Sequence, residues 1–502
     1  MVHCGVRIDM ITPRLFYPGV EMRYTIKHEF TDLPSSRNMK KNLYLAQAKL
    51  VLALWAAAVW ALGHSAGVVS AAEPSKPNVI IILADDQGSV DAGCYGAKDL
   101  VTPGVDALAA HGVRFTQFYS AAPVCSASRA GLLTGRYPWL AGMPSNGPSP
   151  PSEADDQLDT LTGDGLPAKE ITLADMFRSA GYATAHIGKW HLGSGVGHKP
   201  LDHGFDYSFG FMGGCIDNYT HFFYWSGPNC HDLWENNQRV RLPGHYFPDL
   251  MVEKAKAFIG SHRAQPFFMY FAMNMPHYPY QGEEKWLQRY RSLPYPRKLY
   301  AAFVSTLDER VQRLVAYLEQ SGLRERTIIV YQSDNGHSVE ERAHFGGGSS
   351  GPYRGAKFSL FEGGIRLPAI ISWPGHLPEG QVRGQIAHGC DWLPTLAELC
   401  GVTLPKAELN GRSLVPVISS AGSPTPHDVL QWRFATQWAV RQGPWKLLHN
   451  PNDQADARKL AARDKQWFLV NVDEDPGEQV NLAPDHPEIL ERLRKLAPPG
   501  GD

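Results

Sequence analysis

The sequence predicts an α/β fold in which helices sandwich a large mixed, mostly parallel sheet, with a smaller C-terminal subdomain built on an antiparallel sheet. Several short apolar runs lack the alternation of half-buried strands, which is typical of parallel strands covered on both faces. Helical patterns separate these runs, and alternating strands and helices favour an α/β sandwich. The 502 residues, 43% of them hydrophobic, are enough for a large core.

The N-terminal part does not belong to this fold. Residues 1–38 resemble neither core nor signal, and we interpret them as an extension from a wrongly assigned start, with translation beginning at Met39. Residues 39–72 predict a signal peptide, because lysines precede the apolar run Leu50–Leu62 and small residues lead to Ala72. The run is too short to span a bilayer and ends at a glycine, which disfavours a stable membrane anchor. The mature protein is therefore expected to be exported, either periplasmic or secreted.

Charge excludes one class of partner. Removing residues 1–72 takes away eight Lys or Arg and only four Asp or Glu, so the net charge falls from −2 to −6. No basic surface is implied, and nucleic acid binding has no support.

The seven cysteines allow two disulfides in an exported protein, Cys215–Cys230 and Cys390–Cys400. The odd number that remains leaves the pairing open. No Cys-x-x-Cys or zinc-like spacing occurs, so a thiolate-bound structural metal is not expected.

The expected elements alternate along the chain. Buried-type strands are predicted at 78–84, 183–188, 267–272, 327–331 and 369–371. Helices are predicted from Thr102-Pro103 to Gly112 and from Thr172 to Gly181, on their start and stop residues. A long amphipathic helix is expected from Arg297 to Gly322.

Four of the strands end in polar side chains. Because ligands bind beyond the carboxyl ends of strands in open α/β sheets, these side chains are expected to converge at one edge. They are Asp85, Asp86, Lys189, His191, His277, Asp334 and Asn335.

The residue types in this set indicate two kinds of chemistry. The acidic and amide side chains offer only oxygen ligands, which suit calcium or, less well, magnesium. Alternatively, Asp-Asp and Asp-Asn-Gly are ordinary strand-to-loop turns. The cationic residues suit a tetrahedral anion, with histidine as proton donor or acceptor.

A cysteine opens the segment Pro123–Arg136. Cys125 lies at the start of a predicted helix that stops at Thr134-Gly135, where N–H groups and partial positive charge stabilise an anion. Arg129 one turn later would acidify the thiol further. The alternative is a buried structural cysteine.

The pattern Cys125-x-Ala-Ser-Arg129, followed by Leu-Thr-Gly-Arg136, resembles the signature of the sulfatase family. The family's commoner form has proline where this chain has Ala127. The resemblance implies that a maturation enzyme oxidises Cys125 to 3-oxoalanine (formylglycine), whose hydrate is the nucleophile.

Further blocks follow in the family's order, from about Lys76 onward. They are Gly-Lys-Trp-His-Leu-Gly at 188–193, Asn-x-Pro-His-x-Pro at 274–279, Lys-x-x-x-x-Glu-Gly-Gly-x-Arg-x-Pro at 357–368, and the segments 391–396 and 468–482. The resemblance implies an alkaline phosphatase-like fold and hydrolysis of sulfate esters, with a sulfated small molecule or glycan as substrate.

The same resemblance implies roles for individual residues. Calcium would be held by Asp85, Asp86, Asp334 and Asn335, with the modified Cys125 completing the shell. Arg129 would steady the formylglycine hydrate, and His191 would assist at the nucleophile. The sulfate oxygens would be held by Lys189, His277 and Lys357.

The domain assignment places a catalytic domain at 73–418 and a C-terminal α+β subdomain at 427–502, joined by a Ser- and Pro-rich linker. The aromatic segment 213–225 is either a packed lid or a platform for a sugar. Two other functions remain open: a phosphodiesterase or phosphonate monoester hydrolase of the same superfamily, and an exported glycan-binding protein in which Cys125 is never converted.

Overall fold

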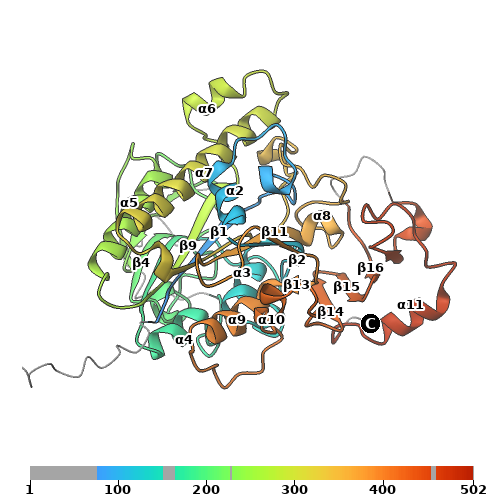
Figure 1. Cartoon of the computed structure of the whole chain (residues 1–502). Helices are drawn as coiled ribbons and strands as arrows, with labels where there is room; N and C mark the ends of the chain where they lie inside the picture. Colours follow the sequence, from blue (N-terminus) through green and yellow to red (C-terminus); the bar gives the residue numbers. More distant parts are fainter. Residues whose placement is uncertain (1–75, 151–163, 226–228, 454–459, 501–502) are drawn as a thin grey trace, which may run out of the picture. The chain divides into compact units, whose positions relative to one another are not determined.

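The central sheet organises the chain (Figure 1). In the computed structural model, which describes residues 76–150, 164–225, 229–453 and 460–500, this sheet has eleven strands in the order β12-β2-β11-β10-β1-β9-β3-β4-β7-β8, with β13 beside β2. Strands β10, β1, β9, β3 and β4 run parallel, and β11, β2 and β7 add antiparallel neighbours. The fold class predicted from the sequence is confirmed. The segments 1–38 and 39–72 lie outside the described residues.

The strands of this sheet are β1 (Asn78–Asp85), β2 (Val113–Tyr119), β3 (Ala183–Lys189), β4 (Tyr207–Phe211), β7 (Trp234–Glu235), β8 (Gln238–Arg239), β9 (Phe267–Pro276), β10 (Thr327–Ser333), β11 (Arg366–Ser372), β12 (Gln381–Arg383) and β13 (Ala387–His388). The helices around it are α2 (Pro103–Ala110), α3 (Cys125–Thr134), α4 (Leu173–Ser179), α5 (Phe247–Ser261), α6 (Glu284–Arg289), α7 (Arg297–Gln320), α8 (Glu362–Ile365), α9 (Trp392–Leu399) and α10 (Val415–Ser419). A small hairpin pairs β5 (Phe222–Phe223) with β6 (Cys230–His231). Short 3-10 helices occupy Gly93–Tyr95, Pro200–His203, Arg324–Arg326, Glu341–Ala343, Gly389–Asp391 and Ala462–Asp464.

Helices cover both faces of the sheet, which explains the continuous apolar runs. Alternate residues of β1 enter two separate cores: Val79, Ile81 and Leu83 pack with α3, α4 and α9, whereas Ile80 and Ile82 pack with α2, α5 and α7. Figure 1 shows these two helix groups on opposite sides of β1 and β9. Every residue of β1 is buried, and the six residues between Asn78 at its start and Asp85 at its end are all apolar.

Six strands of this sheet are not among those predicted, namely β2, β4, β7, β8, β12 and β13, and the two longest of them are β2 and β4. Strand β2 alternates buried and half-buried residues because its partners β11 and β12 lie near one margin of the sheet. Strand β4 contains Gly210, whose close approach to the backbone of β3 leaves no space for a Cβ atom. Glycine and alternation both weaken the sequence signal of a buried strand.

The start of α2 is capped differently from the prediction. Thr102 makes no capping hydrogen bond to the helix. Asp308, from α7, accepts hydrogen bonds from the N–H groups of Gly104 and Val105, at 2.9 and 2.7 Å. A residue distant in sequence thus satisfies the helix terminus.

The two disulfides that the sequence allows, Cys215–Cys230 and Cys390–Cys400, are not formed in the described part of the chain. All six cysteines in the described part of the chain are thiols. The Cys390 thiol instead donates to the carbonyl of Arg136 at 3.2 Å, and burial keeps the pKa of Cys400 raised, to about 12.

The C-terminal portion forms a four-stranded antiparallel sheet, as predicted. Its strands β14 (Leu430–Phe434), β15 (Gln437–Gln442), β16 (Trp445–His449) and β17 (Trp467–Asn471) pair in sequence order, and α11 (Pro487–Arg494) packs on one face. The other face packs against Phe361 and Ile365, which follow the predicted substrate lysine Lys357 in the same segment of the chain. The C-terminal sheet therefore supports the loop that carries Lys357.

A buried ionic network joins the same two regions. Lys446 of β16 lies 2.9 Å from Glu362 and 3.0 Å from Glu478, and all three are fully buried. Glu478 also accepts the N–H of Glu362, at 2.6 Å. Two carboxylates thus share one ammonium group, and burial raises the pKa of Glu478 to about 7 while Lys446 opposes this shift.

The Tm of Glu478→Gln is expected to increase relative to the Tm of the unchanged protein as pH rises from about 5 to 8. Because the pKa of Glu478 is raised on folding, the folded protein binds a proton that the unfolded chain has released, and stability falls as pH rises through about 7. Glutamine removes that loss. Tm measured against pH checks it, with the exposed Glu474→Gln as control; parallel curves for wild type and Glu478→Gln would contradict it.

Candidate functional site

The carboxyl ends of four neighbouring parallel strands form the floor of the site. Strand β1 lies between β9 and β10, and β3 pairs with the other side of β9. At their ends lie Asp85 (β1), Lys189 (β3), His277 after β9 and Asp334 after β10. Parallel register therefore brings together residues that are up to 249 positions apart, since Asn335 donates to Asp86 at 2.6 Å.

Helix α3 brings the cysteine to this edge. Cys125 is its first residue, after Val124 in extended conformation, and Gly135 ends the helix with a φ of 67°. Arg129 anchors the helix: its guanidinium donates to Asp334 Oδ2 at 2.8 and 3.1 Å and to the carbonyl of Lys189 at 3.1 Å. The helix is thereby tied to both β10 and β3.

The predicted metal ligands lie together. Cys125 Sγ is 3.5 Å from Asp85 Oδ1 and 3.9 Å from Asp86 Oδ1. One ligand atom from each of Asp85, Asp86, Cys125 and His277 lies within 4.8 Å of the others. Asp334 Oδ1 accepts the N–H of Asp86 at 3.1 Å, which places a third predicted oxygen side chain beside this group, and Asn335 donates to Asp86 Oδ1 at 2.6 Å. His277 is a candidate metal ligand that the sequence analysis did not include among the predicted ligands.

Two lysines neutralise the carboxylates. Lys189 Nζ lies 3.0 and 2.8 Å from the two oxygens of Asp85. Lys357 Nζ lies 2.9 Å from Asp86 Oδ2 and 3.3 Å from His277 Nε2. The loop of Lys357 is held by backbone hydrogen bonds, from Lys357 N–H to His337 and from Phe358 N–H to Pro123.

Burial and charge act against each other on the acids. Burial opposes ionisation of Asp85, but Lys189 and neighbouring cations outweigh it and hold its pKa well below the usual range. Burial raises the pKa of Asp86 to about 7, against the charge of Lys357. Burial and the charge of Asp85 also raise the pKa of Asp334. The three carboxylates face three cations, namely Lys189, Lys357 and Arg129.

This arrangement fits a divalent cation. Asn335 Oδ1 is buried and has no hydrogen-bond partner among the described residues. A dication bound between Asp85, Asp86 and Asn335 would satisfy this oxygen and stabilise the charged form of Asp86. The ion would add two positive charges to the cluster, which favours an anionic substrate.

The thiol is not acidified, so that expectation is wrong. Burial raises the pKa of Cys125 well above its usual value, and Asp334 and Asp85 add to the shift while Lys189 opposes it. The partial charge of the helix N-terminus acts on a side chain that is 1% exposed and faces carboxylates.

The site opens into a cavity of about 320 Å³. Its lining includes four of the six candidate catalytic residues: Cys125, His191, His277 and Lys357. Lys189 and Arg129 do not line it and are fully buried beneath its floor. Gly214, Cys215, Phe223 and Trp225 of the aromatic segment also line the cavity.

Other residues of the aromatic segment lie elsewhere. Asn218, the first residue of an Asn-x-Thr sequence, is fully buried, and its amide donates to Gln281 at 3.0 Å. His221 bonds the carbonyl of His245 at 3.0 Å. They support the wall and do not line the cavity.

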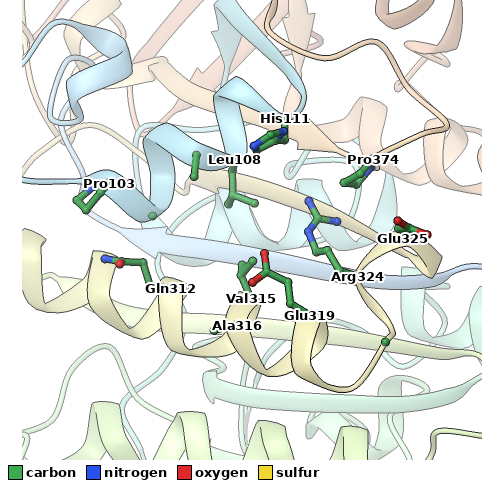
Figure 2. A pocket seen from close by; sticks show the side chains of 13 residues that line it. Pro103, Leu108, His111, Gln312, Val315, Ala316, Glu319, Arg324, Glu325 and Pro374 are labelled. Atoms are coloured by element: carbon green, nitrogen blue, oxygen red, sulfur yellow. The ribbon is translucent and has the colours of Figure 1, made fainter.

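A larger cavity, of about 710 Å³, lies away from this chemistry. Figure 2 shows Gln312 and Glu319 of α7 facing α2, with Arg324 beside Glu319. Arg324 precedes β10, whereas Asp334 follows it, so the two cavities lie at opposite ends of that strand. None of the predicted site residues lines the larger one.

Sequence reasoning missed Glu340, Tyr278 and Asn146, which also line the smaller cavity. Tyr278 lies within the block at 274–279 and its position there is a usable signal. Glu340 lies five residues beyond Asn335 in a loop, and no spacing marks it as a site residue.

The fold, the buried cluster of oxygen ligands, the cysteine that opens α3 and the nearby cations together suit a hydrolase that acts on a small anionic group. Comparisons with known proteins identify the family. Residues 77–402 match the family described as Sulfatase, and residues 355–497 match N-sulphoglucosamine sulphohydrolase, C-terminal. The chain belongs to the sulfatase family, and it is a sulfuric ester hydrolase.

Relatives span most of the chain. N-acetylgalactosamine-6-sulfatase of Sus scrofa is 30% identical over 478 residues, covering 86% of each chain. Arylsulfatase A of Homo sapiens is 32% identical over 472 residues, covering 84% of this chain and 87% of its own.

Solved structures agree with the fold. The crystal structure of Ps i-CgsB has a TM-score of 0.73 and 29% identity, and the match covers 84% of this chain and 92% of that one. Phosphonate monoester hydrolase of Agrobacterium radiobacter has a TM-score of 0.58, with 84% and 95% covered, and at 19% identity this likeness concerns the fold alone.

Proposed function

We propose that the protein is an exported, formylglycine-dependent sulfatase that uses calcium to remove sulfate from a sulfated carbohydrate. The observation that carries this proposal is the position of Cys125: it opens α3 at the edge of the cavity, with its sulfur 3.5 Å from Asp85 and within the group of candidate metal ligands. A maturation enzyme would convert it before the enzyme acts.

The calcium ion would be held by Asp85, Asp86, Asp334 and Asn335, with the modified side chain at position 125 completing the shell. It would supply Lewis acidity, lowering the pKa of the nucleophile and offsetting charge on the transferring group. Calcium is preferred to magnesium because the donors are protein oxygens in an irregular arrangement, and magnesium usually keeps several waters.

The nucleophile would come from the chain itself. Once Cys125 is oxidised to formylglycine, its hydrate supplies one hydroxyl to attack sulfur and a second whose presence allows sulfate to leave without water attacking sulfur. Arg129, fixed on Asp334, steadies the start of α3 so that position 125 keeps its place. Val124 in extended conformation sets the direction of entry.

Lys357 and His277 line the cavity and would hold the sulfate oxygens. Lys189 lies deeper and would act by holding Asp85 in its charged form, with a share in binding the sulfate if its ammonium group moves to the ligand. Preset donors of this kind stabilise charge that grows during transfer.

His191 would move the proton at the nucleophile. Burial lowers its pKa, so the ring is neutral, and its Nδ1 has no hydrogen-bond partner among the described residues. Gly214 leaves space for the ring, since a Cβ atom there would lie 3.0 Å from His191 Cε1.

A sulfated carbohydrate is the substrate class that the cavity supports best. The volume of the cavity is at the lower end for small-molecule sites. At the wall of the cavity, the rings of Trp225 and Tyr278 stack with their centroids 6.0 Å apart and an interplanar angle of 25°. Ps i-CgsB has been solved in complex with k-i-k-neocarrahexaose, and a relative of this chain is named N-acetylgalactosamine-6-sulfatase.

Trp225→Ala is expected to raise KM for a sugar sulfate roughly five-fold or more, with little change in kcat, because an aromatic contact worth about 1 kcal/mol is lost outside the reacting centre. Steady-state kinetics check this, with the exposed Phe345→Ala as control. An unchanged KM for sugar sulfates would show that Trp225 belongs to a lid that does not touch the substrate.

Mass spectrometry of native protein tests the proposal directly. The Cys125 peptide is expected to carry an aldehyde in place of the thiol, and an intact thiol would favour a glycan-binding protein.

Rates on aryl sulfate and aryl phosphate separate a sulfatase from a phosphodiesterase. N-terminal sequencing is expected to find a start near Glu73; a chain that retains residues 1–38 would overturn the export prediction.

A further inference from the structure

Glu340 places a carboxylate in the wall of the sulfate cavity, and no role in the reaction has been given to it above. It lies in the loop after β10, directly before a short 3-10 helix, and its side chain is 16% exposed. Its neighbours in the cavity lining include Lys357, Tyr278 and Trp225. An acidic side chain in a pocket that binds an anion requires a physical reason.

The hydrogen bonds of Glu340 are one-sided. Its oxygen Oε2 accepts from Ser338 Oγ at 2.9 Å and from Tyr278 OH at 3.1 Å, and it lies 3.3 Å from Lys357 Nζ. The other oxygen, Oε1, has no recorded partner in the part of the chain that the structure describes. Three donors on one oxygen hold the carboxylate in a single orientation and leave the second oxygen available to a ligand.

The distance to the reacting centre follows from Lys357. The same ammonium group lies 3.3 Å from Glu340, 2.9 Å from Asp86 and 3.3 Å from His277. A sulfate held by Lys357 and His277 would therefore lie close to Glu340, and a sugar ring attached to it would place the carbon beside the sulfated one within reach of this carboxylate.

We propose that Glu340 selects the sulfated unit: Oε1 accepts a hydrogen bond from a hydroxyl or amide N–H on the carbon beside the sulfate, and its charge rejects a second anion there. This inference rests on the proposed carbohydrate substrate. The substrate class is thus a sugar unit with one sulfate and an uncharged hydrogen-bond donor next to it. Vicinal disulfates and units with an adjacent carboxylate are poor substrates, because Lys357 is already shared with Asp86 and cannot neutralise another charge.

A different role for Glu340 is to position Lys357 alone. The two roles differ in what they affect: loss of positioning slows all sulfate esters equally, whereas loss of selection changes the ratio between substrates. The test must therefore compare ratios within each variant.

The experiment measures kcat/KM for Glu340→Ala and Glu340→Gln on four probes. They are p-nitrophenyl sulfate, the monosulfated methyl hexoside that wild type hydrolyses fastest, the same compound with the neighbouring hydroxyl methylated, and its vicinal disulfate. Glu341→Gln is the matched control, because it changes an adjacent exposed carboxylate that does not line the cavity.

Glu340→Ala is expected to lower the rate on the monosulfated sugar roughly ten-fold or more relative to p-nitrophenyl sulfate and to the methylated sugar, as loss of a hydrogen bond to a charged group predicts. Glu340→Gln, which keeps an acceptor without the charge, is expected to raise the relative rate on the vicinal disulfate roughly ten-fold. Ratios that stay within two-fold of wild type in both variants would overturn the inference and leave the proposed function intact. If wild type hydrolyses p-nitrophenyl sulfate but no sugar sulfate, the proposed substrate and this inference both fail.

Discussion

Cys125→Ala is expected to abolish hydrolysis of sulfate esters, by a factor on the order of 10⁴ or more, while the fold stays intact. The substitution removes the side chain from which the proposed nucleophile is made, and an enzyme that works through a covalent step loses nearly all its rate without its nucleophile. Cys125 is buried but small, and Ala127 and Ala130 on the same helix show that alanine suits this environment. Rates on p-nitrophenyl sulfate, together with Tm and circular dichroism, measure the two effects.

The control is Cys94→Ala, which removes a half-buried thiol outside the site. It is expected to keep wild-type kcat. A Cys125→Ala protein with unchanged kcat would contradict the assignment of the nucleophile, and a protein that fails to fold would be replaced in the test by Cys125→Ser, which keeps the size of the side chain.

Removal of the cation is expected to have the second-largest effect. Chelation with EGTA, or Asp86→Asn, should lower kcat by about 10³-fold or more, because Lewis-acid stabilisation of several kcal/mol is lost. Asp86 is central in the cluster: it contacts Lys357 at 2.9 Å and Asn335 at 2.6 Å, and its Oδ1 lies 3.9 Å from Cys125 Sγ.

A measurement other than activity separates the metal from general damage. Calcium is expected to raise the Tm of the unchanged protein, as any ligand that binds only the folded state does, and to leave the Tm of Asp86→Asn unchanged. Asp485→Asn, at an exposed position, should respond like wild type. A wild-type Tm that does not respond to calcium, with full activity in EGTA, would remove the metal from the proposal.

Much of the fold was predictable because a strand that is buried on both faces has a continuous apolar sequence, which is easily recognised. The runs that became β1, β9 and β10 are continuous and apolar, since one helix layer lies on each side of them. Strands β2 and β4 lack such a continuous apolar sequence. The missing disulfides show a different limit, because a spacing along the chain says nothing about whether two sulfur atoms face each other.

For the site, the sequence by itself determined which side chains gather at one edge, because parallel strands end together and Asp85, Lys189 and Asp334 directly follow or close such strands. The tertiary structure alone decided their depth and partners: Lys189 lies under the floor, the Cys125 thiol is not acidified, and Glu340 lies in the wall. Depth and pairing depend on distances between segments far apart in the chain. A local sequence pattern does not contain these distances, and the desolvation and the charge–charge interactions that shift a pKa depend on them.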